Sequence, residues 1–335
     1  MLLHLMGSSG DGGAETYFLS LVGALRREGV TQAVALRPHA ARERALAEIG
    51  IPTKVLPFTR FDLTTRPRVA AYARRMGAKT LLAWMSRAAS RMPNGPWKRV
   101  GRLGGYYDLR FFGGCDLLVA NTTDIRDYIL RRGWAPNRVV HIANFAEADR
   151  HRALPRSVCS TPENVPLLLS MGRLHREKGH DVTLHALTQL PDAWLWLAGS
   201  GPEEGALKLL ARSLGVADRV RFLGWREDAG ALYRAADLCV FPSRAEPLGN
   251  VVMQAWVYGS PIIASRAIGP AHLIRDGEDG LLVPVGDSYA LASGIRRLLD
   301  DAALRGRMRE AGFLRATAEC DRDAVVQQWR SVLEL

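Results

Sequence analysis

The sequence has few cysteines and no long apolar segment. Its four cysteines lie far apart, without a Cys-x-x-Cys pair and without a histidine at ligand spacing. These absences argue against a disulfide framework and against a metal site. No 18 consecutive residues are apolar, and the first residues lack the basic flank of a secretory signal. We therefore expect a cytoplasmic protein that is at most peripheral to a membrane.

Length and composition fit an ordinary globular protein. The 335 residues correspond to about two domains of roughly 150 residues each, and each is large enough for its own core. The chain is 47% hydrophobic and 24% charged, and its 32 glycines and 17 prolines are spread along the sequence. Collagen-like and low-complexity classes are therefore excluded.

Positive charge is concentrated in the first half of the chain. Residues 1–160 hold 25 Lys and Arg against 12 Asp and Glu, whereas residues 161–335 hold 20 against 22. Residues 60–110 alone carry 12 basic side chains and only two acids. Such a sector attracts nucleic acid, anionic lipid or a phosphorylated acceptor. Apolar residues between the arginines of residues 66–85 fit a basic amphipathic helix on a membrane, and they fit equally well a helix whose arginines face solvent. No nucleic-acid-binding motif accompanies the charge, so nucleic acid is the less favoured partner.

Short apolar runs alternate with helical patterns along the chain. In the first part, strands are predicted over residues 2–6, 32–36, 53–56, 117–120 and 139–142, and helices over 14–27, 40–49 and 122–131. After an irregular segment near 143–165, strands are predicted over residues 167–171, 193–198, 220–223, 238–241, 261–264 and 281–283. This alternation predicts an α/β protein with two doubly wound, Rossmann-like domains. Ligands of such sheets bind at the carboxyl ends of the strands, so we expect the active site in a cleft between the domains.

Two glycine-rich turns follow predicted first strands. Residues 10–15, Gly-Asp-Gly-Gly-Ala-Glu, open the first helix, where Gly12 and Gly13 would let backbone N–H groups approach an anion. The turn is not a P-loop, because the Gly-Lys-Ser/Thr ending is missing. Residues 172–179, Gly-Arg-Leu-His-Arg-Glu-Lys-Gly, follow the first strand of the second domain. There Arg173 and Lys178 could clamp a diphosphate, although a solvated loop would look the same.

The densest pattern lies at residues 236–256. A buried strand ends at Pro242, the following loop carries Glu246, and Gly249-Asn250 open a helix. A carboxylate beside an open helix N-terminus suits a ligand with sugar hydroxyls at one end and phosphates at the other. Gln254 lies one helical turn after Asn250, on the same face of that helix.

Taken together, these motifs resemble those of the retaining glycosyltransferases of family four, which have the GT-B fold. The resemblance rests on Gly-Arg-Leu-x-x-x-Lys-Gly, on the Gly199-Ser200-Gly201-Pro202 turn and on Ser-x-x-Glu-Pro-x-Gly, and it covers nearly the whole chain. It implies an acceptor-binding domain over residues 1–150 together with a final helix over 321–335. It also implies a nucleotide-sugar-binding domain over residues 151–320.

The resemblance also implies roles for individual residues. Arg173 and Lys178 would stabilise the departing nucleotide diphosphate, and Glu246 would bind hydroxyls of the donor sugar. The implied donor-binding residues are Gly12, Gly13, Gly172, Gly201, Leu248, Gly249, Asn250 and Gln254. The implied reaction is metal-independent hexosyl transfer from a UDP- or GDP-sugar, without a cofactor. The expected acceptor is an anionic or lipid-linked saccharide at a membrane surface, as in lipopolysaccharide-type envelope glycan synthesis.

The sequence departs from the family at two places. The family's second glutamate, separated from the first by seven residues, is Gln254 here, which removes a charge-assisted hydrogen bond of order 1 kcal/mol. Where many relatives have a histidine, this chain has Gly104-Gly105-Tyr106-Tyr107-Asp108. Tyr106, Tyr107 and Asp108 are therefore acceptor-side candidates only, and no general base is assigned.

Gln254 keeps a second interpretation open, that of a nucleotide-sugar-binding protein without transferase activity. A GT-B-like epimerase would need further carboxylates that the sequence does not identify, and a phosphorylase would need a much longer chain. A polyanion-binding module would explain the charge of the first half but not the motifs of the second. The donor base, the sugar, the acceptor and the oligomeric state have no signature in the sequence.

Overall fold

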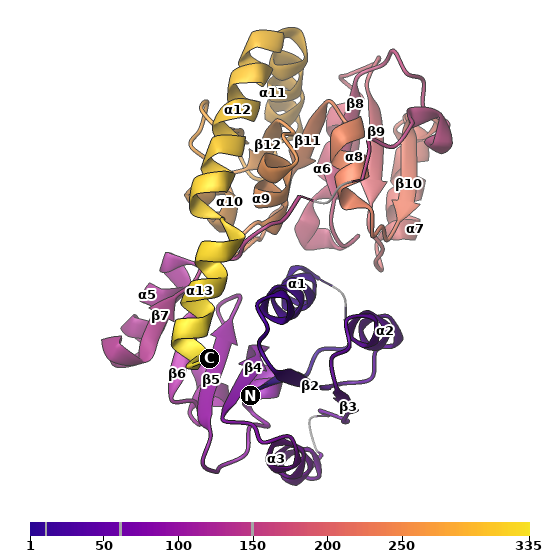
Figure 1. Cartoon of the computed structure of the whole chain (residues 1–335). Helices are drawn as coiled ribbons and strands as arrows, with labels where there is room; N and C mark the ends of the chain where they lie inside the picture. The colour runs from indigo at the N-terminus through magenta and orange to yellow at the C-terminus, as the bar shows by residue number, and fades with distance from the viewer. Residues whose placement is uncertain (11, 60–61, 149–150) are drawn as a thin grey trace. The chain divides into compact units, whose positions relative to one another are not determined.

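The computed structural model describes residues 1–10, 12–59, 62–148 and 151–335 (Figure 1). Two residues of the motifs above, Asp11 of the glycine-rich turn and Arg60 of the basic stretch, lie outside the described residues. The chain divides into two compact units. Unit 1 comprises Met1–Asn144 with Arg322–Leu335, and unit 2 comprises Phe145–Asp321. The last helix of the chain thus packs in the first unit.

Unit 1 is built on a parallel sheet whose strands follow the order β3-β2-β1-β4-β5-β6-β7. The strands are β1 (Leu2–Met6), β2 (Gln32–Leu36), β3 (Thr53–Val55), β4 (Thr80–Trp84), β5 (Lys98–Leu103), β6 (Leu117–Ala120) and β7 (Val139–His141). Every residue of β1, β2 and β4 is buried, because a parallel sheet needs helices on both of its faces.

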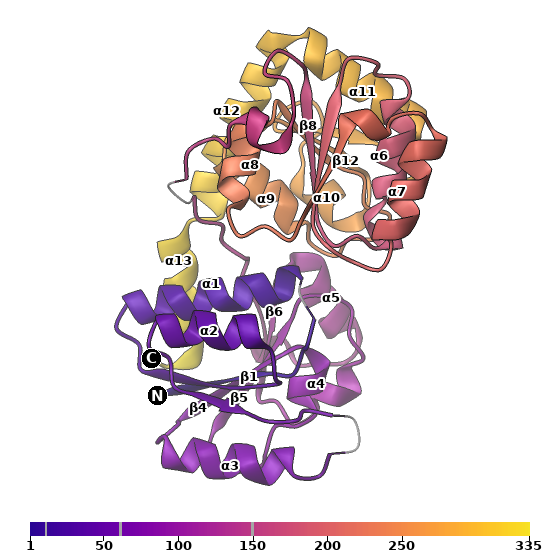
Figure 2. The same cartoon turned by 90° about the vertical axis from the view of Figure 1, so that its right-hand side faces the viewer.

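Helices cover the sheet of unit 1 on both faces (Figure 2). They are α1 (Gly13–Arg27), α2 (Ala40–Glu48), α3 (Thr65–Arg75), α4 (Met85–Ala89), α5 (Thr123–Arg131) and α13 (Arg322–Leu333). Helices α1 and α2 lie on one face and α3 on the other. The last helix is fixed to the first, because Trp329 Nε1 donates to Tyr17 Oη at 3.2 Å.

Residues 66–85 do not form the single amphipathic membrane helix considered above, because they are divided between helix α3 and strand β4. The apolar residues of α3, Val69, Ala70, Tyr72 and Ala73, are buried in the core of unit 1 and face no membrane. The next apolar stretch is strand β4 rather than helix, because its side chains are buried on both faces of the sheet. What α3 presents outward is its arginines, of which Arg66, Arg68, Arg74 and Arg75 are exposed.

Unit 2 is a second parallel sheet with the order β10-β9-β8-β11-β12-β13. Its strands are β8 (Leu167–Met171), β9 (Trp194–Ala198), β10 (Val220–Gly224), β11 (Leu238–Phe241), β12 (Ile262–Ser265) and β13 (Leu281–Val283). Its helices are α6 (His180–Leu187), α7 (Glu204–Ser213), α8 (Ala229–Ala235), α9 (Asn250–Val257), α10 (Ile268–Leu273), α11 (Ser288–Asp300) and α12 (Ala302–Glu319). Residues of α6, α7 and α11 form one core against the sheet, and residues of α8 and α9 form another.

Each sheet reverses its strand order at one place. In unit 1 the reversal lies between β1 and β4, and in unit 2 it lies between β8 and β11. The loops that leave two such strands diverge to opposite faces, so a crevice opens at their carboxyl ends. The predicted α/β class with two doubly wound domains is confirmed, and the motifs of residues 172–179 and 242–250 follow the two central strands of unit 2.

None of the helices in the described ranges is both long enough and apolar enough to cross a lipid bilayer.

Candidate active site

Two loops meet where the sheet of unit 2 reverses its order. One leaves β8 at Gly172 and the other leaves β11 at Pro242. The backbone N–H groups of Arg244 and Ala245 both donate to the carbonyl oxygen of Glu177, at 2.7 and 3.4 Å. Gly179 has φ +67°, and a Cβ there would lie 2.2 Å from the carbonyl oxygen of Pro242. The two loops therefore pack backbone against backbone, which fixes the side chains that they carry.

Lys178 and Glu246 form an ion pair between these loops, Nζ to Oε2. Both side chains are largely buried, with 19% and 13% of their surface exposed. Lys178 Nζ also lies 5.7 Å from the centre of the Phe241 ring. Partial burial strengthens a charge pair because less water screens it. The pair thus places a fixed cation and a fixed carboxylate side by side at the edge of the sheet.

Arg173 is held by its backbone while its side chain is exposed. His180 Nε2 donates to the Arg173 carbonyl oxygen at 3.2 Å, and its Nδ1 lies 3.1 Å from Ser170 Oγ, which donates to it. Within the described ranges, the Arg173 guanidinium makes no hydrogen bond or ion pair. It is therefore a second cation on the same loop, available to an anionic ligand.

Burial lowers the pKa of His180 from its ordinary 6.5 to about 4. The unfolded chain therefore takes up a proton at this residue near pH 6.5, whereas the folded chain does so only near pH 4. The stabilisation that this difference gives is present above pH 6.5 and is lost as the pH falls toward 4, by about 3 kcal/mol at most.

We expect urea unfolding of the wild type to show this loss between pH 7 and pH 4.5, together with a contribution of the same sign from buried His4. A His180→Asn variant should lose less stability over this range. An identical pH dependence in the two proteins would contradict this interpretation of His180.

The turn after β9 packs directly on the loop after β8. Gly199 has φ +151°, and a Cβ there would lie 1.9 Å from the Gly172 carbonyl oxygen. A Cβ at Gly201 would lie 2.3 Å from the Leu174 carbonyl oxygen. The Leu174 N–H donates to the Ser200 carbonyl at 2.9 Å. Gly199 and Gly201 thus allow two loops to approach at a distance that no side chain would permit. Gly172 contributes through its φ of +142°, since a Cβ there would make an ordinary contact with the Lys178 side chain at 3.8 Å.

Leu248, Gly249 and Asn250 shape the start of α9. Gly249 is the N-cap residue with φ +95°, and no side chain caps the helix. Leu248 is buried and packs against the start of α10, where a Cβ at Gly269 would lie 2.4 Å from the Leu248 carbonyl oxygen. The Gly269 N–H donates to the Glu246 carbonyl at 2.7 Å. The loop that carries Glu246 is thus fixed on both sides.

Gln254 lies on α9, half-buried, and Tyr233 Oη donates to its Oε1 at 3.4 Å. Burial raises the pKa of Tyr233 well above its usual value, so the phenol keeps its proton. The Tyr233 ring stacks on Tyr258 with 5.3 Å between ring centres. A glutamine held by its carbonyl oxygen presents its amide N–H groups, whereas a glutamate would present a second acceptor.

The donor-side candidates of unit 1 lie at the start of α1. Gly12 is the N-cap residue of this helix with an extended φ of 177°, and its carbonyl accepts from the Thr16 N–H at 2.9 Å. Gly13 is the first helical residue and is exposed.

The acceptor-side candidates Tyr106, Tyr107 and Asp108 follow β5, and much of their bonding capacity is used locally. Tyr106 Oη donates to Asp124, and burial together with this bond raises the pKa of Tyr106 to about 12. Tyr107 is half-buried, and its carbonyl accepts from Tyr128 Oη at 2.9 Å. Asp108 caps a 3₁₀ turn and pairs with Arg110 at 2.7 Å. The three side chains do not form one cluster of free groups.

Sequence reasoning overlooked Arg102, which is 1% exposed at the end of β5. Its guanidinium lies between the rings of Tyr17 and Trp84, 5.0 and 4.9 Å from their centres, and Nη2 donates to Asn144 Oδ1 at 2.7 Å. Its Nε and Nη1 find no partner in the part of the chain that the structure describes. Its signal in the sequence is weak, because β5 also carries Lys98 and Arg99, so a basic residue two positions before Gly104-Gly105 does not stand out.

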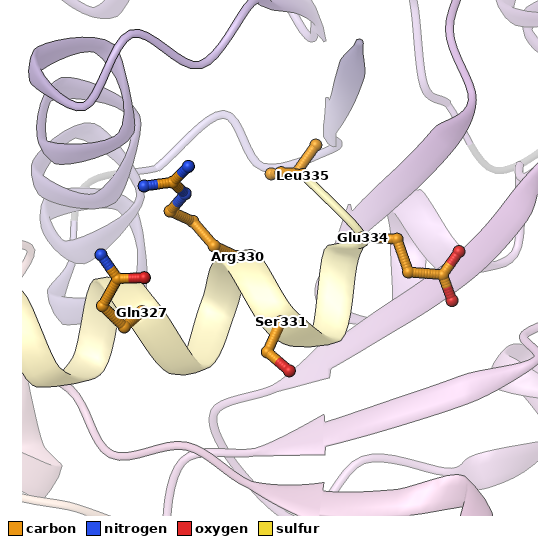
Figure 3. Close-up of a pocket in the computed structure, with 5 residues that line it drawn as sticks. All are labelled: Gln327, Arg330, Ser331, Glu334 and Leu335. Carbon is orange, nitrogen blue, oxygen red and sulfur yellow. The ribbon is translucent and has the colours of Figure 1, made fainter.

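Two other features of the described ranges add no residue to the site. A hollow of about 340 Å³ lies along α13 and is lined by Gln327, Arg330, Ser331, Glu334 and Leu335 (Figure 3). It shares no residue with the donor-side or acceptor-side candidates. In the described ranges, no three His, Cys, Asp or Glu side chains gather as they would around a metal ion.

Comparison with known proteins gives the family of this chain. The sequence pattern described as "Glycosyl transferases group 1" matches residues 156–315. The chain is 35% identical to the lipopolysaccharide core biosynthesis glycosyltransferase LpsE of Rhizobium meliloti (strain 1021), over 96% of each chain. It is 36% identical to LpsD of the same organism, over 90% of this chain and 89% of the relative.

Solved structures agree on the fold. HepE of Anabaena, crystallised with UDP and glucose, superposes with a TM-score of 0.85 at 23% identity, over 99% of each chain. WaaG, a glycosyltransferase involved in lipopolysaccharide biosynthesis, superposes with a TM-score of 0.78 at 19% identity, again over 99% of each chain. The expected GT-B fold is therefore confirmed, and the chain belongs to the group 1 glycosyltransferases.

Proposed function

We propose that this glycosyltransferase transfers a hexosyl group from a nucleotide-diphosphate sugar to a saccharide or lipid-linked acceptor, with retention as in family four. The observation that carries the proposal is the Lys178–Glu246 ion pair, with Arg173 on the same loop as Lys178, at the place where the sheet of unit 2 reverses its order. Two cations suit a diphosphate, and a fixed carboxylate suits sugar hydroxyls. All three side chains come from loops at one edge of one sheet.

In this proposal the barrier is lowered chiefly by electrostatics. When the bond between the anomeric carbon and the phosphate oxygen breaks, its electron pair stays with the diphosphate. Arg173 and Lys178 neutralise that charge, and the backbone N–H groups near Leu248, Gly249 and Asn250 support the phosphate and the sugar. Because these groups are positioned before the reaction, they need not reorganise during it. The acceptor oxygen forms the new bond to the anomeric carbon, and its proton passes to an oxygen of the departing diphosphate.

The reaction is proposed to need neither metal nor cofactor, since Arg173 and Lys178 together supply two cations for the expected diphosphate. Unchanged turnover in EDTA would support this. Retention can be followed by proton NMR of the glucose first released when UDP-glucose is hydrolysed slowly without an acceptor. The α-anomer as first product supports retention, and the β-anomer would contradict it.

The donor is proposed to be a UDP- or GDP-sugar. The Anabaena HepE structures contain UDP, UDP with glucose, and UDP-glucose. The acceptor is proposed to be a saccharide of a lipopolysaccharide-type glycan, because LpsE and LpsD, which match almost the whole chain, are lipopolysaccharide core glycosyltransferases. The proposed location is the cytoplasm, with peripheral contact to the inner face of an anionic membrane through residues 60–110.

The proposed membrane contact can be tested by replacing exposed arginines of α3. Each arginine near an anionic surface contributes about 1 kcal/mol, so losing two should weaken binding by roughly thirtyfold. We expect Arg68→Gln/Arg75→Gln to reduce sedimentation with phosphatidylglycerol vesicles accordingly, whereas Arg307→Gln/Arg309→Gln on exposed positions of α12 should have little effect. Equal binding by the two double variants would refute the contact through α3.

Gln254 favours a second candidate function, that of a nucleotide-sugar-binding protein without transfer. A carboxylate at this position would accept hydrogen bonds from ribose hydroxyls and from Tyr233 Oη. We expect Gln254→Glu to bind UDP about five- to tenfold more tightly, from roughly 1 kcal/mol of charge-assisted bonding. Titration calorimetry and nucleotide release from UDP-glucose separate the two functions. Tighter binding with higher turnover supports the enzyme, and tighter binding without any turnover supports the binding protein.

A further inference from the structure

The segment Gly7–Gly10 of unit 1 lies where that sheet reverses its order, between β1 and β4. Two arginines from different helices hold its backbone carbonyls. Arg42 Nη1 donates to the Ser8 carbonyl at 2.9 Å, and Arg42 Nη2 donates to the Gly10 carbonyl at 2.8 Å. Arg87 Nη1 donates to the Gly7 carbonyl at 3.3 Å. Three carbonyls within four residues thus face guanidinium groups.

Arg42 occupies a place that is unfavourable for a cation. It is 2% exposed and lies in the first turn of α2, where the helix dipole opposes positive charge. The first turn is rigid, because the Arg42 N–H donates to His39 Nδ1 at 3.3 Å and the His39 N–H donates to Glu43 Oε1 at 2.9 Å. The guanidinium fork of this buried cation holds two carbonyls of the segment.

Carbonyl oxygens repel anions, and guanidinium groups that bind them remove this repulsion. Arg42 and Arg87 also bring positive charge beneath the segment. The segment also packs directly on α4, the helix that carries Arg87, where a Cβ at Gly7 would be 3.0 Å from the Ala88 backbone nitrogen. These contacts therefore fix the position of the segment and also make its electrostatic potential more favourable for an anion.

We propose that Arg42 is a positioning residue, supported by Arg87, that prepares residues 7–10 and the following Gly12 and Gly13 for a diphosphate. This inference rests on the proposed function, in which Gly12 and Gly13 approach the donor. Arg42 touches neither donor nor acceptor in this account and acts through the backbone that it holds.

The test compares Arg42→Met with Arg44→Met, which removes an exposed arginine from the same helix. Titration calorimetry measures Kd for UDP-glucose and for UMP, and the stoichiometry of UMP binding gives the folded fraction. We expect Arg42→Met to raise the Kd of UDP-glucose at least fivefold and to leave that of UMP within twofold. Arg44→Met should change neither. A merely structural role would lower the folded fraction without changing the ratio of the two Kd values.

Two more variants keep the test decisive if Arg42→Met does not fold. Arg42→Lys retains the charge but can hold only one carbonyl well, so we expect an intermediate ratio, and Arg87→Met should give a two- to threefold change. Ratios equal to that of the wild type in all variants that fold would overturn the proposal. If the ratios are unchanged but the wild type binds UMP and UDP-glucose, the role of Arg42 is refuted and the proposed function stands. If the wild type binds no nucleotide sugar, the role of Arg42 and the proposed function are both refuted.

Discussion

Replacing Glu246 with alanine should lower nucleotide release from UDP-glucose by about 10²- to 10³-fold, the size of effect seen when one preorganised electrostatic group is removed from an active site. The carboxylate is lost from the sugar side of the site. Binding of UDP alone should not weaken, because Lys178, now without its ion-pair partner, can turn fully to the phosphates. A loss of turnover without any loss of UDP binding is expected only if Glu246 binds the sugar while it pairs with Lys178.

The measurement combines steady-state kinetics with titration of UDP. Glu246→Gln should behave like Glu246→Ala, because the neutral amide cannot form an ion pair with Lys178. Glu278→Gln, an exposed position in the same unit, serves as the control and should match the wild type. Unchanged turnover in Glu246→Ala would remove Glu246 from the site.

Gly199→Ala should have the largest effect on stability. A Cβ at this residue would lie 1.9 Å from the Gly172 carbonyl oxygen, and φ +151° is strained for any residue with a side chain. The turn after β9 would have to move away from the loop that carries Arg173. We expect unfolding free energy to fall by about 3 kcal/mol or more, from strain and steric overlap together. Binding of UDP should weaken as well.

Gly205→Ala provides the matched control for urea unfolding. Gly205 lies in α7, and a Cβ there meets nothing within 4 Å. Alanine is favoured over glycine by up to about 1 kcal/mol within a helix, and Gly205 lies in the first turn, so this variant should be as stable as the wild type or more stable. Equal stability of the two variants would show that the close approach of the two loops does not matter.

Much of the fold could be predicted from the sequence because its strands are buried on both faces. Continuous apolar runs such as those of β1, β8 and β11 have the predicted bounds in the structure. Strands β4 and β5 were not predicted. Strand β5 contains Lys98, Arg99 and Arg102, of which Arg99 pairs with Asp116 and Arg102 lies between two aromatic rings. In a hydrophobic pattern, charged residues argue against a buried strand. Here tertiary contacts pair these charges, so the strand forms in spite of them.

In the candidate site, too, some residues could be predicted from the sequence and others could not. Arg173, Lys178 and Glu246 were identified through motifs, but 68 residues separate Lys178 from Glu246 in the sequence. Their pairing depends on β8 and β11 being neighbours in the sheet, which only the strand order reveals. Arg42 and Arg87 were missed because they hold backbone carbonyls, and backbone partners leave no trace in a sequence.

The central claim is that the loops after β8 and β11 bind a nucleotide-diphosphate sugar. The most direct test is a thermal-shift panel of UDP, GDP, ADP and their common hexose forms, on the wild type and on Lys178→Met. A ligand that binds only the native state must raise the melting temperature, by about 2.7 kcal/mol of added stability at a hundred times its Kd. We predict a rise for one nucleotide and its sugar in the wild type, and a much smaller rise in Lys178→Met. No shift with any nucleotide at millimolar concentration, or an equal shift in both proteins, would contradict the account.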